Sequence, residues 1–141
     1  MQFTSARHRE KKVEEGVITG VITEWWQKEL LAQGRAEFDG LLRTLSKYRA
    51  KNWNPNDYAA LLGKHAGIYE LRFKGDHRQY RPLGFLLPPA EVGSGELDVL
   101  VLLIGAYKKM GTWTPHDARD TAVDRKKQVL ANRSLLHDYK F

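Results

Sequence analysis

The feature that most constrains the fold is an apolar run in the second half of the chain. Leu97–Tyr107 consists mainly of Val, Leu and Ile and is interrupted only by Asp98 and Gly105. Apolar residues occupy odd and even positions alike, whereas a strand with one solvated face would alternate. The run therefore predicts a central β-strand that is covered on both faces.

Two further strands and a hairpin precede this run. Ile68–Phe73 alternates between two faces, and Gln79–Leu87 is the returning strand. Lys74–Arg78 between them predicts a hairpin turn with Gly75-Asp76 at its tip. Pro82 removes a hydrogen-bond donor from the second strand, which indicates an edge or a bulge there.

Before the hairpin, the sequence predicts a strand and two helices. Val17–Thr23 is rich in β-branched residues and predicts a first strand. Glu24–Gln33 favours a helix, with Gly34 as a break. Arg35–Lys51 repeats apolar residues at three- and four-residue spacing, which predicts a second helix with one apolar face.

A last helix is predicted near the end of the chain. In Thr114-Pro115-His116-Asp117, Thr114 is expected to be the N-cap, Pro115 the first helical residue and Asp117 the acidic residue of a capping pair. The spacing of apolar residues extends this helix to about Arg133.

The order of these elements favours an α+β fold with an antiparallel meander that carries the helix pair on one face. The chain has 141 residues, which is typical of one domain. We expect Met1–Gly16 to be a charged arm and residues 17–141 to form a single domain. Hydrophobic residues make up 42% of the chain, enough for a packed core.

Several kinds of chemistry have no support in the sequence. There is no cysteine, which excludes disulfides, thiolate metal sites and cysteine nucleophiles. The five histidines lack the helical spacing of metal ligands. Glycine fingerprints of nucleotide-binding loops and a serine nucleophile elbow are also missing. We therefore predict no metal site and no cofactor.

The composition also suggests a location and a class of partner. The N-terminal segment lacks the apolar stretch of a secretory signal, and Val99–Ala106 is too short to span a membrane. We expect a cytoplasmic protein without a membrane partner. The formal net charge of +6 favours polyanions such as RNA or DNA, although many basic proteins bind neither.

Basic residues recur at strand positions and strand ends. Arg72 lies on the first hairpin strand, Arg81 follows Tyr80 on the second, and Lys108 and Lys109 follow Tyr107. In adjacent strands such cations can converge, and cations beside tyrosines suit phosphates and unpaired bases. The alternative is purely structural: Glu70 is a ready partner for Arg72, Arg81 can extend from the edge of the core, and the lysines can end a strand in solvent.

Three segments together resemble the RelE/ParE toxin superfamily, and most closely its HigB-like, phage-derived branch. They are Gly67–Lys74 (Gly-Ile-Tyr-Glu-Leu-Arg-Phe-Lys), Gln79–Phe85 (Gln-Tyr-Arg-Pro-Leu-Gly-Phe) and Leu102–Lys109 (Leu-Leu-Ile-Gly-Ala-Tyr-Lys-Lys). The resemblance covers roughly Val17 to Val129. It implies a RelE-like compact antiparallel sheet with two N-terminal helices packed on it and a C-terminal helix.

The resemblance also implies an activity: active members cut messenger RNA, often on the ribosome, through the 2′-hydroxyl and without a metal ion. Arg81 matches the arginine expected to hold the scissile phosphate, and Arg72, Lys108 and Lys109 match the assisting cations. Tyr107 stands where some relatives carry an acid or a base. We expect RNA contacts from a surrounding set formed by Lys74, His77, Arg78, Tyr80 and His116.

A toxin of this kind is neutralised by a cognate antitoxin, expected here to be a helix-turn-helix protein encoded next to it. We also expect an acidic or amphipathic antitoxin segment to cover the basic face. Two alternatives remain open: a member of the same fold that poisons another target such as gyrase, and a catalytically inactive, phage-derived protein that binds nucleic acid.

Overall fold

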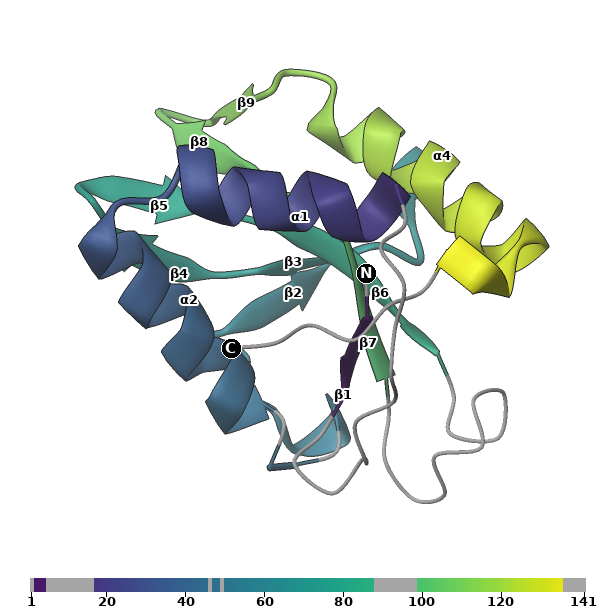
Figure 1. Ribbon diagram of the computed structural model, residues 1–141, viewed down its shortest axis with the longest axis horizontal. Helices are drawn as coiled ribbons and strands as arrows, with labels where there is room; N and C mark the ends of the chain where they lie inside the picture. The colour runs from purple at the N-terminus through teal and green to yellow at the C-terminus, as the bar shows by residue number, and fades with distance from the viewer. Residues whose placement is uncertain (1, 5–16, 46, 49, 88–98, 136–141) are drawn as a thin grey trace.

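The structure is a computed structural model that describes residues 2–4, 17–45, 47–48, 50–87 and 99–135 (Figure 1). Residues 88–96, whose Pro, Gly and Ser residues predict a loop, and most of the predicted N-terminal arm lie outside these residues. The described elements are β1 Gln2–Thr4, α1 Val17–Lys28, α2 Ala32–Leu45, η1 Ala50–Asn52, β2 Tyr58–Ala60, η2 Gly63–His65, β3 Tyr69–Leu71, β4 Phe73–Gly75, β5 Arg78–Tyr80, β6 Leu83–Leu87, β7 Val99–Ile104, β8 Tyr107–Lys109, β9 Thr112–Thr114, α4 Ala118–Ala131 and η3 Arg133–Leu135. The predicted α+β class is confirmed.

The strands form two antiparallel sheets, with orders β1-β7-β6-β3-β2 and β4-β5-β8-β9. Three chain segments run from one sheet into the other: β3 leads into β4 across Arg72, β5 into β6 across Arg81-Pro82, and β7 into β8 across Gly105-Ala106. These connecting residues are called the bend below. Pairing continues through it, because the amide of Leu71 donates to Pro82 (2.9 Å) and that of Arg81 to Ala106 (2.7 Å). The predicted antiparallel pairing of consecutive strands is present, but the sequence did not indicate that each long strand is divided between two sheets at the bend.

The predicted central strand is confirmed over the part that the structure describes. β7 lies between β1 and β6, and its residues Leu100 to Leu103 are each at most 1% exposed. The predicted range was longer at its C-terminal end, because β7 ends at Ile104 and Tyr107 belongs to β8. Positions 97 and 98 lie outside the described residues. Gln2–Thr4, expected to be part of a charged arm, instead pairs with β7 as an edge strand.

The prediction of a first strand at Val17–Thr23 is wrong, because these residues begin helix α1. β-Branched residues lower helix propensity by only a few tenths of a kcal/mol each, so packing decides the outcome. Ile22 and Trp25 are buried where α1 packs on β7, and the Trp25 ring meets Phe38 edge-on with centroids 5.3 Å apart. Figure 1 shows α1 crossing the sheets between α2 and α4.

The second predicted helix is present, but its boundaries differ. α2 extends from Ala32 to Leu45, and its buried face includes Phe38, Leu42 and Leu45, as the spacing indicated. Gly34 was expected to break the helix and instead lies in its first turn. A Cβ atom at Gly34 would collide with the carboxylate of Asp76, so glycine is required by the close approach of the β4–β5 turn.

The C-terminal helix is also present, but the predicted start is wrong. Thr114 pairs with Tyr107 in the β8–β9 ladder, so its backbone belongs to the sheet. Helix α4 begins at Ala118 with Asp117 as N-cap residue and ends at Ala131. It packs on β6 and β7. Within the described part of the chain, no helix is long and apolar enough to cross a membrane.

Candidate nucleic-acid interface

The two hairpins of the four-stranded sheet end in tight turns of the same kind. The β4–β5 turn is Asp76-His77, with φ of 53° and 61°, and the β8–β9 turn is Met110-Gly111, with φ of 52° and 79°. Positive φ at both central residues suits the twist of paired strands. The predicted hairpin is thus confirmed, but its tip is Asp76-His77 and not Gly75-Asp76.

A hollow of about 440 Å³ lies between the two hairpins. Its lining is mainly polar and basic and consists of Asp76, His77, Arg78, Gln79, Tyr107, Lys108, Lys109 and Met110. A neighbouring hollow of about 360 Å³ shares His77, Arg78 and Gln79 with it and adds Gln33, Lys74 and Gly75. The two hollows are called the hairpin cleft below. They bring together most of the basic residues predicted from the sequence.

The strand register divides the candidate residues between two faces of the four-stranded sheet. One row across the strands consists of Lys74, Gln79, Lys108 and Trp113. The next row, which projects to the other face, consists of Phe73, Tyr80, Tyr107 and Thr114. The second row faces the helices, because Phe38 of α2 contacts Phe73 and Trp25 of α1 contacts Tyr80. Tyr80, a predicted RNA contact, is fully buried in this core.

Aromatic rings hold several of the cations in place. The Arg78 guanidinium lies over the Tyr107 ring, 4.4 Å from its centroid, and the Lys108 ammonium lies 4.8 Å from the centroid of Trp113. Arg119, in the first turn of α4, approaches the same Trp113 ring at 5.7 Å. Such contacts restrict long side chains without neutralising them, so the cations keep their charge for an anionic ligand.

The carboxylate that lines the cleft, Asp76, is already engaged. It accepts hydrogen bonds from the amides of Leu31 (2.8 Å) and Gly34 (3.0 Å), at the N-terminal end of α2, and from the Tyr80 hydroxyl (2.8 Å). Burial acts to raise the pKa of Asp76, but these hydrogen bonds outweigh it and hold the pKa below its usual value. Burial and the bond to Asp76 raise the pKa of Tyr80 to about 12. Asp76 therefore anchors the hairpin to α2.

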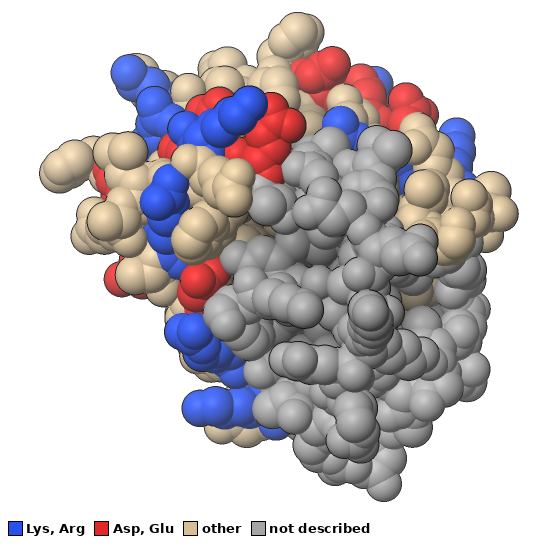
Figure 2. All heavy atoms as spheres, viewed as in Figure 1, with Lys and Arg blue, Asp and Glu red and all other residues tan. Residues whose placement is uncertain are grey.

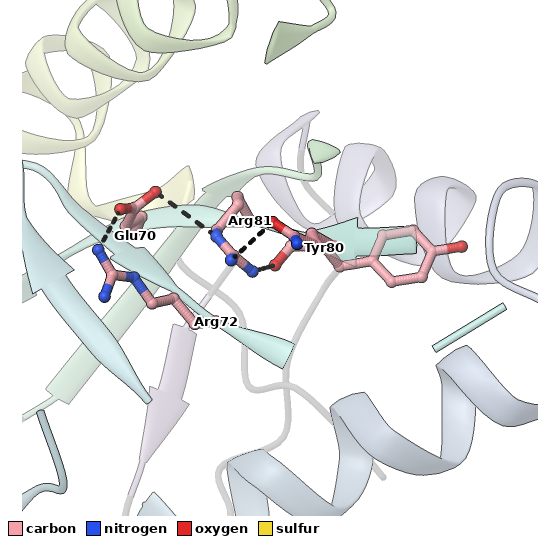
Figure 3. A network of polar contacts seen from close by, with 5 residues as sticks. Glu70, Arg72, Tyr80 and Arg81 are labelled. Carbon is pink, nitrogen blue, oxygen red and sulfur yellow. Dashed lines mark hydrogen bonds and ion pairs between the residues drawn. The ribbon is translucent and has the colours of Figure 1, made fainter. Parts of the chain in front are cut away.

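Arg72 and Arg81, the two arginines matched to the phosphate-binding positions, lie at the bend around Glu70 (Figure 3). The Arg72 Nη2 atom is 3.0 Å from Glu70 Oε1, and the Arg81 Nε atom is 4.0 Å from Glu70 Oε2. Arg81 also donates to the carbonyl oxygen of Tyr80 (2.7 Å), and its side chain is only 14% exposed. Figure 3 shows the Tyr80 ring pointing away from this network.

The charges at the bend are partly removed from water. Burial lowers the pKa of Arg81, against the opposing effect of Glu70. Glu70 is 5% exposed, and its Oε2 atom and the Nε atom of Arg72 are buried without hydrogen-bond partners. Glu70 and Arg81 therefore form the internal part of an ion-pair cluster, and Arg72, whose side chain is 39% exposed, lies at its surface. The pair of Glu70 and Arg72 is the one that the structural alternative proposed.

The predicted site thus separates into parts. The hairpin cleft contains six of the predicted residues: Lys74, His77, Arg78, Tyr107, Lys108 and Lys109. Arg72 and Arg81 lie at the bend, and Tyr80 lies in the core. His116 is exposed in the segment between β9 and α4 and does not line the cleft. On the surface, basic side chains gather near the end of α1 and along α2, with acidic ones among them (Figure 2).

Sequence inspection missed a polar contact outside the cleft. His65, in η2, is 7% exposed, and its Nε2 atom lies 2.7 Å from Oδ1 of Asp120 in α4. The hydrogen bond from His65, followed by the nearby Lys64, lowers the pKa of Asp120. The two residues are far apart in the sequence, so no local pattern could reveal the pair. Among the described residues, no group of three or more His, Asp or Glu side chains is arranged to hold a metal ion.

Comparison with known proteins adds no assignment: no protein-family model, no curated protein and no solved structure matches this chain.

Proposed function

We propose that this protein is an endoribonuclease toxin similar to the RelE/ParE superfamily, and to its HigB-like branch, that cuts messenger RNA without a metal ion and so inhibits translation. The observation that carries the proposal is the hairpin cleft. It gathers Arg78, Lys108 and Lys109 with His77 and Tyr107 around one hollow. The arrangement of two N-terminal helices, a bent antiparallel sheet and a C-terminal helix is compatible with the fold that the resemblance implies.

RNA binding follows from the charge of the cleft. Arg78, Lys108 and Lys109 approach a ligand from two neighbouring hairpins, and Lys74 extends the basic lining into the adjoining hollow. Asp76, the carboxylate in this lining, is occupied by the end of α2 and by Tyr80. A phosphodiester in the cleft therefore meets Arg78, Lys108 and Lys109, of which Arg78 is also close enough to Asp76 to help lower the pKa of that carboxyl. The remaining excess of cations favours a flexible single strand.

Cleavage through the 2′-hydroxyl needs a base, stabilisation of the charged phosphorane and a proton for the leaving 5′-oxygen. We assign the stabilisation to Arg78, which lines the cleft over the Tyr107 ring, with Lys108 reaching the same hollow from the other face of the sheet, where it lies over Trp113. His77 lies at the hairpin tip, and histidine accepts and donates protons near neutral pH. His77 is thus the first candidate for proton transfer, with Tyr107 and Lys109 next to it in the same lining.

The resemblance assigns binding of the scissile phosphate first to Arg81, whereas the geometry favours the cations of the hairpin cleft. The Arg81 guanidinium is engaged by Glu70 and by the carbonyl oxygen of Tyr80. A role for Arg81 in the free protein is therefore to support β5, the strand that carries Arg78 and Gln79. We propose that Arg81 and Arg72 maintain the cleft rather than contact the scissile phosphate.

The test is cleavage of an end-labelled messenger RNA by the purified protein in excess chelator. We expect products that end in a 2′,3′-cyclic phosphate, and loss of cleavage in His77→Ala and Lys108→Ala. Lys51→Ala is the control for Lys108→Ala, because Lys51 is an exposed lysine outside the cleft and its removal changes the net charge by the same amount. No cleavage by the unmodified protein, or a strict requirement for magnesium, would overturn the nuclease proposal.

A second candidate function is a RelE/ParE-like toxin or phage-derived protein that binds nucleic acid without cutting it. The Glu70–arginine network favours it, because both arginines matched to the phosphate are tied to a buried carboxylate. Induction in a bacterial host separates the candidates: growth arrest with degraded messages supports the nuclease, and arrest with intact messages supports another target. In either case we propose a cognate antitoxin with an acidic segment that covers the hairpin cleft.

A further inference from the structure

A third hollow, which shares Tyr107 with the hairpin cleft, lies between α1 and the segments around Ile104-Gly105 and Thr114-Pro115. Its volume is about 410 Å³, and it is called the α1 pocket below. Its apolar lining includes Trp25, Ile104, Tyr107 and Pro115, and its acidic residues are Glu24 and Glu29. Tyr107 lines both this pocket and the hairpin cleft. A nucleotide with its phosphate in the cleft could therefore place its base beyond Tyr107.

The floor of the α1 pocket is suited to a flat ring. The Trp25 ring lies directly against Gly105, where any Cβ atom would overlap it. This indole is fixed edge-on against Phe38 and Tyr80, with centroids 5.3 and 5.8 Å away. Tyr107 is likewise held, with Arg78 over its ring at 4.4 Å. Trp25 is 8% exposed and Arg78 covers one face of the Tyr107 ring, so the pocket offers a base a rigid apolar floor beside a cationic cleft rather than two free ring faces.

The two acidic residues of the pocket differ in their availability. Glu24 forms an ion pair with Lys28 at 2.8 Å, one turn along α1. The Glu29 side chain forms no hydrogen bond or ion pair with any other residue that the structure describes. Its backbone is held in place, because its amide donates to Trp25 (2.8 Å) and its carbonyl oxygen accepts from the Tyr80 hydroxyl (3.5 Å). Glu29 thus presents an unoccupied carboxylate from a fixed position.

We infer that the α1 pocket binds a guanine base of the RNA and that Glu29 is the residue that selects it. A carboxylate only accepts hydrogen bonds, and it offers two oxygens side by side. Guanine alone presents two adjacent N–H donors, N1–H and the N2 amino group, on its Watson–Crick edge. Adenine and cytosine place a ring acceptor next to their amino group, and uracil places carbonyl oxygens on both sides of its single N–H.

The inference rests on the proposed function, because RNA in the hairpin cleft is what brings a base to the α1 pocket. Its test uses two ligands, so that the two ideas can fail separately. The first is a pair of eight-nucleotide oligoribonucleotides, oligo-U and the same oligomer with one central guanine. The second is the free nucleosides guanosine and adenosine, which carry no phosphate and do not need the cleft.

For the oligomers, fluorescence anisotropy should give about tenfold tighter binding when guanine is present, as expected for one bidentate contact. Glu29→Gln should abolish this preference and leave the affinity for oligo-U unchanged or slightly higher. Glu37→Gln is the control, since it removes the same charge from an exposed residue of α2 that lines neither the pocket nor the cleft, and it should keep the preference.

For the nucleosides, guanosine should shift the indole N–H resonance of Trp25, identified with Trp25→Phe, and adenosine should not. Guanosine binding without RNA binding would support the pocket and overturn the proposed function. Equal affinity for both oligomers together with an unshifted Trp25 signal would overturn the pocket and leave the proposed function standing. Failure of both ligands, or a preference retained in Glu29→Gln, would also overturn the assignment of Glu29.

Discussion

The bend and the hairpin cleft both contain basic residues on the same strands, yet they use that charge differently. At the bend, Arg72 and Arg81 surround Glu70, and the Arg81 side chain is 14% exposed. In the cleft, Arg78 and Lys108 lie over aromatic rings and line an open hollow. Arg78 and Arg81 are only three residues apart. The difference shows that a basic residue on a strand is a better ligand-binding candidate where it lines an open hollow than where a buried carboxylate holds it in an ion pair.

The largest expected effect comes from removing the carboxylate at the bend. Glu70→Ala leaves two arginines without their counter-ion, and we expect the free energy of unfolding to fall by about 3 kcal/mol. Urea denaturation measures this change in the free energy of unfolding. Glu24→Gln breaks an exposed ion pair and should leave the urea midpoint almost unchanged. An unchanged midpoint in Glu70→Ala would show that the bend arginines do not depend on Glu70.

Arg78 lies in the cleft, and Arg81, three residues later, lies at the bend. Replacing each in turn tests directly whether the two regions have different roles. Arg78→Ala removes a cation from the cleft, and we expect the rate of RNA cleavage to fall about a hundredfold with little change in stability. Arg81→Ala should lower the unfolding free energy and should affect cleavage less than Arg78→Ala does. Single-turnover cleavage rates, measured on samples that circular dichroism shows to be folded, decide the matter. If Arg81→Ala slowed cleavage more than Arg78→Ala, binding of the scissile phosphate would instead be assigned to Arg81.

The attachment of the cleft to the helices can be tested with two glycines of α2. Gly34→Ala places a methyl group against the Asp76 carboxylate, and we expect a loss of about 2 kcal/mol in unfolding free energy from overpacking. Gly40→Ala is the matched control, because nothing lies within 4 Å of a Cβ atom there and alanine favours a helix by about 0.8 kcal/mol. Thermal melts should therefore move in opposite directions, and stabilisation of both variants would contradict the close contact.

The smallest effect concerns pH. Because the pKa of Asp76 is lowered in the folded protein, its contribution to stability is present above its unfolded-state value near 3.8 and is lost as pH falls below it. Asp76→Asn should cost up to about 1 kcal/mol at neutral pH, because it removes the negative charge at the N-terminal end of α2 and one of the two acceptor oxygens. The difference between the two proteins should narrow below pH 4. Urea midpoints from pH 3 to 7 measure it, and a constant difference would contradict the role of the charged form.

Features set by local sequence were predictable. The apolar run predicted β7, and Gly75-Asp76 between two alternating segments predicted the β4–β5 hairpin. The helical segment at Val17–Thr23 was not predictable from its β-branched residues, because burial of Ile22 and Trp25 against the sheet determines it. The bend also depends on distant contacts, since Gly105 is needed for the ring of Trp25, which comes from another element.

The residue types of the candidate site were predictable from the sequence, but their division between the hairpin cleft and the bend was not. Lys108, Lys109 and Tyr107 follow an identifiable strand, so their place at its end could be anticipated. Strand alternation does not show which face meets the helices, and for this reason Tyr80 was expected at the surface and is buried. Nor does it show that Arg81 approaches Glu70 from the neighbouring strand. Only the register and the tertiary packing distinguish the cleft cations from the bend cations.

The two-residue turns at the hairpin tips have a consequence for the thermodynamics of binding. Long, mobile loops lose conformational entropy when they close on a ligand, at a cost of about 0.5–1.5 kcal/mol for each side chain that becomes fixed. Here Asp76-His77 and Met110-Gly111 have defined backbone conformations, and Asp76 ties the first turn to α2. The cleft is thus largely preorganised, so a ligand has little backbone to order and its affinity reflects mainly the contacts that it gains.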